Sequence, residues 1–564
     1  MITPFEPSQP SKVTTKSKQA SKAKPKKTNG ASKSSKPKTK TKTKAMTKTD
    51  RKAQAEAEAE KFWEKKTALF ENPNNSKTFN EFIGVARETS SAKTPLEFFN
   101  LFFTDEIWDQ IITESNRYHD QYVQNDNWKP ISKEEIMAFI GVTIAMGIIN
   151  LPELEQYWRK DGICNIPWFS TVMTYTRYKA ILKFIHLVDK ENLPHKDSPD
   201  YKLYKLGGIH LKLNDLFAKL YFRSQELSID EQMVGTRCCI GFIQYMTKKP
   251  TKFGIKIWVL AEAHTGYCQQ FQIYTGKSND GQENGLTYRV CTDLLTPTYL
   301  NKNHHVYFDN YFTTIHLMQD LASNSTFTCG TIRSDRGRFP ASFTAKGKLE
   351  RGESEFRCNN NNLAVRWKDK RDVYVVSTIH GNSIKQVQRR GEEEPVSKPT
   401  MICQYNSFMN GVDKCDQKIS SYDMQRKTRK WWKKLFLRLV ELSIINAMVI
   451  LITIHADILP VCRRHRVFRT VLIHELVQPL IDIDNDNVTS KRQTNTNATR
   501  LRGRHFPSSK HLKRGACSVC AYKRGKDGKQ SRKKTSQYCK KCGKIVLKAT
   551  TQKVIPTRNI TPNF

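Results

Sequence analysis

The chain has 564 residues, and its 94 Lys and Arg against 54 Asp and Glu give a formal net charge of +40. This length predicts several domains with a sizeable core, and 38% hydrophobic residues exclude a wholly disordered chain. No uncharged apolar run reaches the roughly 18 residues of a membrane span. The best candidate, residues 435–454, contains Arg438 and Glu441 and is predicted to be a buried helix. No secretory signal opens the sequence, so we expect the cysteines in a reducing compartment.

The positive charge is concentrated at the two ends of the chain. Residues 1–52 hold 16 Lys and Arg against two acidic residues, and residues 491–564 hold 21 against one. Basic ends favour nucleic acid as a partner, because each neutralised phosphate releases a counterion; a solubilising tail is the alternative for the first end. Residues 1–58 are predicted to be a disordered basic tail, whose Lys-rich stretches resemble nuclear-import signals. We therefore expect the protein in the nucleus.

Residues 59–224 are predicted to form a helical domain. Thr94 and Glu97 form a capping box, and Ser132 and Glu135 form a second one, each followed by apolar side chains at helical spacing. This aromatic-rich stretch is typical of a core and not of a ligand site.

From residue 225 the pattern changes to strands. Three successive strands, a helix and a fourth strand are the order of a ribonuclease-H-like α/β core. Within 225–334 the predicted strands are 226–230, 253–260, 270–274, 304–308 and 327–332, and the predicted helices are 286–295 and 311–322. The remaining chain is assigned to a separate β-rich insertion (335–400), the last helical part of the core (401–455), a linker (456–512) and a basic zinc-binding module (513–564).

Acidic residues stand where the predicted core strands end. Asp230 and Asp309 each follow an apolar strand, and Asp413 and Asp416 share one face of a predicted helix. Carboxylates gathered at two strand ends and on a facing helix can hold two divalent cations, which promote an in-line phosphoryl displacement. For any one of these residues, a hydrogen bond to a loop amide or a solvated helix face is the alternative.

Four ordered segments resemble motifs of the piggyBac transposase family, and the similarity covers roughly residues 94–455. The segments are Leu-Ser-Ile-Asp-Glu-Gln-Met-Val-Gly (227–235), Lys-Pro-Thr-Lys-Phe-Gly-Ile-Lys (249–256), Phe-Asp-Asn-Tyr-Phe-Thr (308–313) and Asn-Gly-Val-Asp-Lys-Cys-Asp-Gln (410–417).

This resemblance implies a cut-and-paste DNA transposase, with a helical dimerisation and DNA-binding domain before the ribonuclease-H-like core. It implies that Asp230, Asp309 and Asp413 form the catalytic triad that binds two Mg²⁺, with Asp416 close to the metals. In that family, water cuts one strand, the freed 3′-hydroxyl attacks the other strand to make a hairpin, and the opened ends join target DNA at TTAA. The resemblance also implies a homodimer on double-stranded DNA.

A basic segment with two tryptophans, Arg-Lys-Thr-Arg-Lys-Trp-Trp-Lys-Lys (426–434), follows the last acidic motif. Lys427, Arg429, Lys430 and Trp431 are predicted to contact phosphates and bases. A helix with its tryptophans in the core and its lysines in water is an equal alternative, and the family resemblance favours DNA.

Two Cys-x-x-Cys pairs predict a single structural zinc ion near the end of the chain. The pairs are Cys517 with Cys520, and Cys539 with Cys542. Four thiolates at this spacing close a tetrahedral site, and the basic residues between the pairs favour DNA over an acidic protein partner. The family's tails usually carry further Cys and His ligands, whereas neither residue follows Cys542 in this chain.

The leading hypothesis is a nuclear, Mg-dependent DNA transposase without a membrane association. A transposase-derived DNA- or chromatin-binding protein that does not cut strands is the first alternative. A ribonuclease-H-type nuclease with other substrates is the second.

Overall fold

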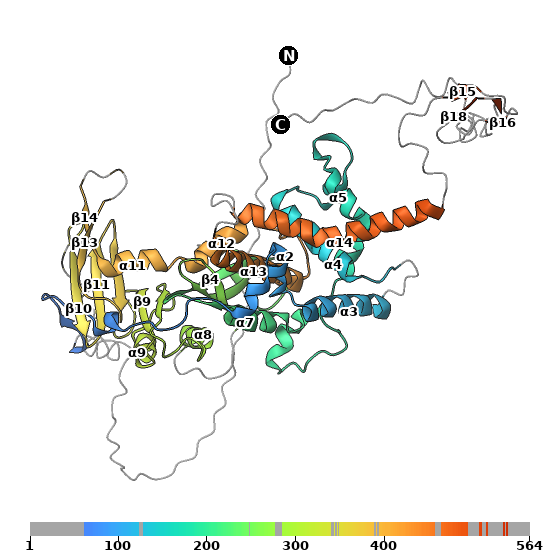
Figure 1. Ribbon diagram of the computed structural model, residues 1–564. Helices are drawn as coiled ribbons and strands as arrows, with labels where there is room; N and C mark the ends of the chain where they lie inside the picture. Colours follow the sequence, from blue (N-terminus) through green and yellow to red (C-terminus); the bar gives the residue numbers. More distant parts are fainter. Residues whose placement is uncertain are drawn as a thin grey trace, which may run out of the picture. The chain divides into compact units, whose positions relative to one another are not determined.

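The computed structural model describes residues 61–494, apart from 123–127, 248, 277–284, 340–342, 344–346, 348, 389–390, 392–393 and 457–463, together with four short strands between 507 and 539. A helical region and a mixed β-sheet lie side by side in the described part of the chain (Figure 1). The predicted basic tail, 1–58, lies outside the described residues.

The helical region follows the predicted starts. Thr94 accepts a hydrogen bond from the backbone of Glu97, whose side chain accepts one in return, and Ser132 and Glu135 do the same. Both capping boxes are therefore confirmed. The helices are α2 (Pro95–Asn100), α3 (Asp105–Tyr122), α4 (Lys133–Ile148), α5 (Pro167–Val172), α6 (Tyr175–Phe184) and α7 (Ile209–Leu220). Short 3₁₀ turns are Pro73–Ser76, Arg87–Ser91, Leu154–Trp158, Gly162–Cys164, Pro199–Lys202 and Tyr204–Leu206, and a two-strand ladder joins β2 (Gly84–Val85) to β3 (Tyr221–Phe222).

The centre of the sheet has the strand directions of a ribonuclease-H-like core. The strands are β4 (Glu226–Gly235), β5 (Gln244–Tyr245), β6 (Phe253–Glu262), β7 (Cys268–Ile273), β8 (His305–Phe308) and β9 (Phe327–Thr331). Strands β4, β6 and β7 form an antiparallel meander, while β8 runs parallel to β4 and β9 runs parallel to β8. Helices α8 (Leu286–Leu294) and α9 (Ile315–Ser323) supply the connections to the parallel strands.

The predicted separate insertion is part of the same sheet. Strands β10 (Ser354–Asn359), β11 (Asn362–Lys368) and β12 (Asp372–Ser377) form a meander, and β12 pairs with β9 of the core. The hairpin of β13 (Ile384–Val387) and β14 (Val396–Pro399) follows in the same segment and forms a two-stranded sheet of its own. The prediction of a separate unit is wrong because β9 offers its free edge to β12.

The first described residues belong to this sheet and not to the helical region. Strand β1 (Glu64–Lys65) pairs with β10 at the outer edge, and the Asn74 side chain donates a hydrogen bond of 2.9 Å to the Thr378 carbonyl oxygen. The predicted boundary at residue 59 therefore does not separate the structural units.

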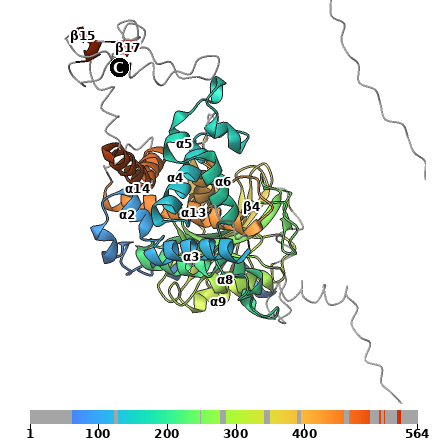
Figure 2. The same cartoon turned by 90° about the vertical axis from the view of Figure 1, so that its right-hand side faces the viewer.

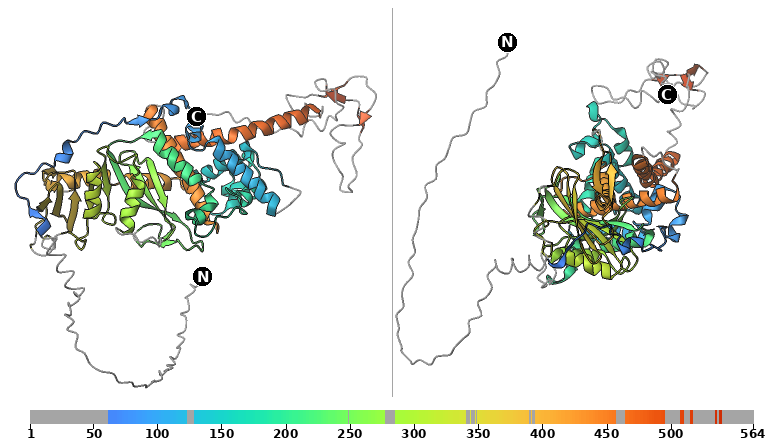
Figure 3. Two further views of the ribbon diagram at one scale, coloured as in Figure 1. Left: turned by 90° about the horizontal axis from the view of Figure 1, so that it is seen from below. Right: turned by 90° about the vertical axis from the view of Figure 1, so that its left-hand side faces the viewer.

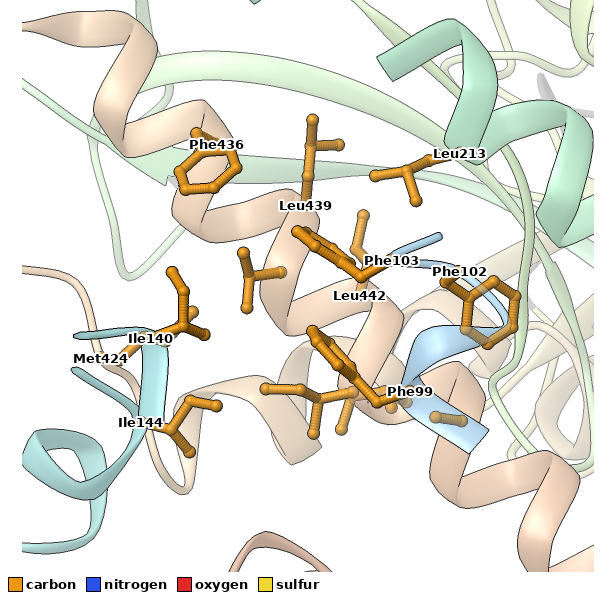
Figure 4. Packing of buried hydrophobic residues seen from close by; sticks show 14 of the residues in the cluster. Phe99, Phe102, Phe103, Ile140, Ile144, Leu213, Met424, Phe436, Leu439 and Leu442 are labelled. Atoms are coloured by element: carbon orange, nitrogen blue, oxygen red, sulfur yellow. The ribbon is translucent and has the colours of Figure 1, made fainter. Parts of the chain in front are cut away.

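Three helices complete the core: α11 (Thr400–Phe408), α12 (Gly411–Ser420) and α13 (Trp431–Ile454). Among the described residues, α13 is the one helix long and apolar enough to cross a membrane, and 89% of its apolar window is buried inside the protein. Figure 4 shows Leu439 and Leu442 of α13 beside Phe103 from the helical region. The predicted buried helix is confirmed.

A long helix occupies most of the segment predicted to be a linker. Helix α14 (Arg464–Thr494) packs along α4 and α2, as Figures 2 and 3 show from several sides. Phe468, Leu472 and Leu476 repeat every four residues on its buried face, and Arg469 is fully buried in an ion pair with Glu441. The linker prediction is wrong here, because apolar residues at every fourth position give this segment a buried helical face.

Two small ladders are described near the end of the chain. Strand β15 (Pro507–Ser509) pairs with β18 (Gln537–Cys539), and β16 (Gly515–Ala516) pairs with β17 (Lys534–Thr535).

Candidate active site

Asp230 and Asp309 are neighbours on adjacent parallel strands. The pairing of β4 with β8 ends at Ile229 opposite Phe308, so the next residue on each strand is the aspartate. Adjacent strands lie about 4.8 Å apart. The sequence placed Asp230 at a strand end, but β4 continues to Gly235, where its pairing with β6 ends. The end of β8, and not of β4, therefore exposes Asp230.

Each of these aspartates is oriented by a backbone amide. Asp230 Oδ1 accepts from Glu231 N at 2.7 Å, and Asp309 Oδ1 accepts from Tyr311 N at 2.9 Å. Burial raises the pKa of Asp230 to about 7, with Lys249 opposing the shift and Glu231 adding to it. Burial also raises the pKa of Asp309. Because both carboxylates are desolvated and adjacent, their ionised form is stable only with a cation nearby.

Asp413 and Asp416 come from α12, which packs against β4 and β6. Gly411 allows this close approach, because a Cβ there would clash with Ser228 Oγ and lie 3.0 Å from the Glu262 carbonyl oxygen. Asp413 is exposed. Asp416 Oδ1 accepts a hydrogen bond of 3.2 Å from Arg438; burial raises the pKa of Asp416, and the Arg438 charge lowers it.

Lys249 is the counter-ion that connects the two groups of carboxylates. Its Nζ lies 3.9 Å from Asp230 Oδ1 and 3.6 Å from Glu231 Oε1. Burial lowers the pKa of Lys249, but attraction to Asp230, Glu231, Asp413 and Asp416 outweighs it, so the pKa is raised. Lys249 belongs to the segment 249–256, and the sequence alone assigned it no role. It lies just before β6, and the pairing of β6 with β4 brings its side chain to the acidic cluster.

The donor chemistry of the cluster suits a hard divalent cation, but the carboxylates are not yet gathered around one point. No three His, Cys, Asp or Glu side chains within the described ranges lie close enough to hold one ion. Carboxylate oxygens are the ligands that Mg²⁺ prefers, and a backbone hydrogen bond to Oδ1 orients each of these two aspartates. Asp230 and Asp309 therefore fit a Mg²⁺ site in two respects. Their carboxylates are the ligand type that Mg²⁺ prefers, and they lie next to each other.

The predicted DNA-binding segment lies between α12 and α13. Lys427, Arg429 and Lys430 are exposed, as the DNA hypothesis requires. Trp431 is half-buried, with its ring edge-to-face against Phe242 at 5.5 Å between centroids. Trp432 is only 4% exposed and packs in the core, so the alternative interpretation holds for this second tryptophan.

Three of the four predicted zinc ligands lie outside the described residues. These are Cys517, Cys520 and Cys542, and Cys539 is described only as the last residue of β18. The zinc site stays a prediction.

Comparisons with known proteins give a consistent family. The family model for Transposase IS4 matches residues 94–448. PiggyBac transposable element-derived protein 3 of Homo sapiens is 30% identical over 381 residues, which are 65% of this chain and 62% of that protein. PiggyBac transposable element-derived protein 2 of Homo sapiens is 23% identical over 371 residues, 64% of this chain and 61% of that protein. The chain thus spans less than two thirds of these two relatives.

The fold also has a solved counterpart. The structure described as a piggyBac transposase synaptic complex with hairpin DNA matches with a TM-score of 0.66 and 22% identity. The match covers 83% of this chain and 98% of that one. Together with the family match over most of the helical region and the core, this likeness of fold assigns the protein: the chain belongs to the piggyBac-type Transposase IS4 family.

Proposed function

We propose that the protein is a DNA transposase of piggyBac type, which excises and integrates DNA by phosphoryl transfer at TTAA targets. The observation that carries this proposal is the adjacency of Asp230 and Asp309 at the end of the β4–β8 pairing, with α12, the helix that holds Asp413 and Asp416, packed against the same strand. Carboxylates at two neighbouring strand positions and on an adjacent helix are the ligand types that two-metal phosphoryl transfer needs.

In this proposal Asp230, Asp309 and Asp413 hold Mg²⁺, and Asp416 supports them while paired with Arg438. Bound Mg²⁺ would activate the attacking oxygen and stabilise the leaving oxygen of the phosphodiester. The backbone amides of Glu231 and Tyr311 fix the carboxylate orientations in advance. Lys249 neutralises the cluster until the metal is bound, and its ammonium then becomes free to pair with a phosphate.

The partners follow from the charge distribution. Lys427, Arg429 and Lys430 contact the phosphates of double-stranded DNA, and Trp431 supports them from its half-buried position. The two basic ends add affinity that is independent of sequence. We include in the proposal a homodimer, a nuclear location, and a zinc-stapled tail formed by Cys517, Cys520, Cys539 and Cys542.

A second function is a transposase-derived protein that binds DNA or chromatin without cutting it. Two observations favour it: the matched human proteins are named transposable element-derived proteins, and the described carboxylates are not within reach of one shared ion. The basic ends, with Lys427, Arg429 and Lys430, would carry this function without the aspartates.

Strand nicking separates the two functions. Supercoiled DNA that carries the genomic sequences flanking this gene is incubated with Mg²⁺ and the full-length protein. We expect nicking by the wild type, a loss of at least about 100-fold in Asp309→Asn or Asp230→Ala, and unchanged DNA affinity in both variants. Asp293→Asn, at an exposed position of α8 where the carboxylate pairs with Arg289, is the matched control and should nick normally. Equal nicking by wild type and Asp309→Asn rejects the catalytic proposal, and binding without nicking by the wild type favours the second function.

A further inference from the structure

A groove lined by basic side chains lies next to the acidic cluster. It is a cavity of about 990 Å³ between the loop that follows β4, the start of β6 and the segment that enters α13. The charged residues among those described as lining it are all cations: Arg237, Lys252, Lys427, Arg429 and Lys434. We call this cavity the basic groove. Three of its cations, Lys427, Arg429 and Lys434, belong to the basic segment 426–434, whereas Arg237 and Lys252 come from the β4–β6 side.

Lys434 gives the strongest sign that the groove holds an anion. It lies in the first turns of α13, is 9% exposed, and forms no hydrogen bond or ion pair through its ammonium with any described residue. Burial lowers the pKa of Lys434, against the attraction of Asp423. The side chain lines the groove, where a ligand of opposite charge would offset the desolvation of its ammonium. The N-terminus of the 24-residue helix α13, with no acidic residue in its first turn, adds partial positive charge nearby.

Two segments that line the groove, the end of β4 and the loop before β6, also lead to the acidic cluster. Gly235, at the end of β4, lines the groove and lies five residues beyond Asp230, which is about 16 Å along a strand. On the opposite wall, Pro250 lines the groove directly after Lys249, whose Nζ is 3.9 Å from Asp230. One strand of a DNA duplex carries a phosphate about every 3.4 Å along the axis, so roughly five phosphates span this distance.

A second basic hollow continues the groove. A cavity of about 190 Å³ shares Arg429 with it and is also lined by Lys190, Lys205 and Lys430. Trp431 and Trp432 also line this hollow and give it an aromatic wall. The cations therefore follow one path from the acidic cluster along the entry to α13.

We propose that the basic groove binds the phosphates of the DNA strand that leaves the scissile bond, and so directs that strand past Asp230 and Asp309. This inference rests on the proposed function in naming DNA as the ligand. The guanidinium groups of Arg237 and Arg429 suit bidentate contacts to phosphate, and four further features of the path (Lys252, Lys427, Lys434 and the helix end) supply charge without reading bases. Binding here is independent of base sequence.

Lysine footprinting tests the groove in the full-length protein, where affinity alone would be dominated by the basic ends. The protein is treated with an amine-reactive reagent in EDTA, with and without a DNA hairpin bearing a single-stranded extension, and modified lysines are mapped by mass spectrometry. We expect at least about threefold protection of Lys252 and Lys427, which are exposed, and no protection of exposed Lys385 on β13. Parallel samples contain inorganic phosphate or poly-glutamate. Equal protection by poly-glutamate, or protection of Lys385 to the same degree as Lys252, overturns the proposal.

Lys434→Met is the second test, because this side chain is too buried for footprinting. Methionine fills the same space without the charge, so thermal stability should be unchanged or higher, while the slope of log affinity for DNA against log salt falls by about 0.9. Lys385→Met is the control and should leave the slope unchanged. A lower melting temperature with an unchanged slope assigns Lys434 a structural role and contradicts the inference. Both tests are done without divalent metal, so neither depends on cleavage. Protection of Lys252 here, together with no nicking by the wild type in the Mg²⁺ assay, refutes the transposase activity alone. Nicking in that assay with Lys252 unprotected here refutes the groove alone.

Discussion

Lys249 Nζ lies 3.9 Å from Asp230 Oδ1 and donates a hydrogen bond of 3.0 Å to the Glu231 carbonyl oxygen. The ammonium therefore acts as a counter-ion within the acidic cluster. An ammonium and a divalent cation can neutralise the same carboxylates. In the absence of metal, Lys249 therefore reduces the electrostatic repulsion between the carboxylates of the cluster.

Replacing Lys249 by methionine should make the fold more dependent on divalent metal. Without the ammonium, Asp230, Glu231 and the α12 carboxylates repel one another, so the metal-free melting temperature should fall and added Mg²⁺ or Ca²⁺ should raise it more than in the wild type. Differential scanning fluorimetry over a metal titration measures both effects. Lys252→Met, an exposed neighbour, is the control. Identical metal-induced shifts in Lys249→Met and wild type would show that the ammonium does not neutralise the cluster.

Gly411 sets the distance between α12 and β4. A Cβ at this position would clash with Ser228 Oγ, so Gly411→Ala should push Asp413 away from Asp230. Overpacking of this kind costs about 1–3 kcal/mol, and we expect DNA nicking to fall by at least about tenfold while DNA affinity is retained. Gly241→Ala, where a Cβ meets nothing within 4 Å, is the matched control. Normal nicking by Gly411→Ala would mean that the spacing of α12 does not limit catalysis.

The buried ion pair of Arg469 with Glu441 should hold α14 on the core. Both side chains are 0% exposed, and Arg469→Leu leaves Glu441 with a buried charge. Removal of one partner of a buried pair costs about 3–5 kcal/mol. We expect faster proteolysis within α14 by trypsin and a lower melting temperature. Arg466→Leu, exposed on the same helix, should change neither; a proteolysis rate in Arg469→Leu equal to that of wild type would argue against this anchoring.

Acid should destabilise the fold through buried neutral histidines, of which His304 is one. Burial, with the Arg223 charge adding to its effect, lowers the pKa of His304 to about 3, and its Nδ1 lies 3.2 Å from the Gln225 carbonyl oxygen. An unfolded histidine titrates near 6.5, so this contribution to stability is complete above about pH 6.5 and is lost as the pH falls toward 3.

The test is the dependence of the melting temperature on pH. His304→Gln removes the proton uptake that accompanies unfolding, so its melting temperature should fall less steeply than that of the wild type between pH 6.5 and 4. His195→Gln, at an exposed position, should follow the wild-type curve. A curve for His304→Gln with the wild-type slope would contradict the assignment of a neutral buried imidazole.

The features that the sequence predicted well are determined by local chemistry. The capping boxes at Thr94 and Ser132 form because one side chain and one backbone amide three residues apart are sufficient. The order of strands and helices from residue 226 to residue 331 was predictable because each strand is apolar and bounded by turns. The adjacency of Asp230 and Asp309 then follows from the parallel pairing that this order requires.

The features that the sequence did not predict depend on contacts between distant segments. Strand β4 continues past Asp230 because β6 supplies a hydrogen-bonding partner up to Gly235. The pairing of β12 with β9 and the ion pair of Arg469 with Glu441 are likewise set by tertiary contacts. Lys249 lies in the loop just before β6, so its position beside Asp230 depends on the pairing of β6 with β4.

Iron-mediated cleavage of the protein backbone tests most directly whether Asp230, Asp309 and Asp413 share a metal site. Fe²⁺ replaces Mg²⁺ among oxygen ligands, and with ascorbate and peroxide it generates hydroxyl radicals that cut the chain close to the bound ion. The account predicts fragments that end near residues 230, 309 and 413 together, suppressed by excess Mg²⁺ and lost together in Asp309→Asn. Cuts at only one of these three segments, or cuts that persist unchanged in Asp309→Asn, would contradict it.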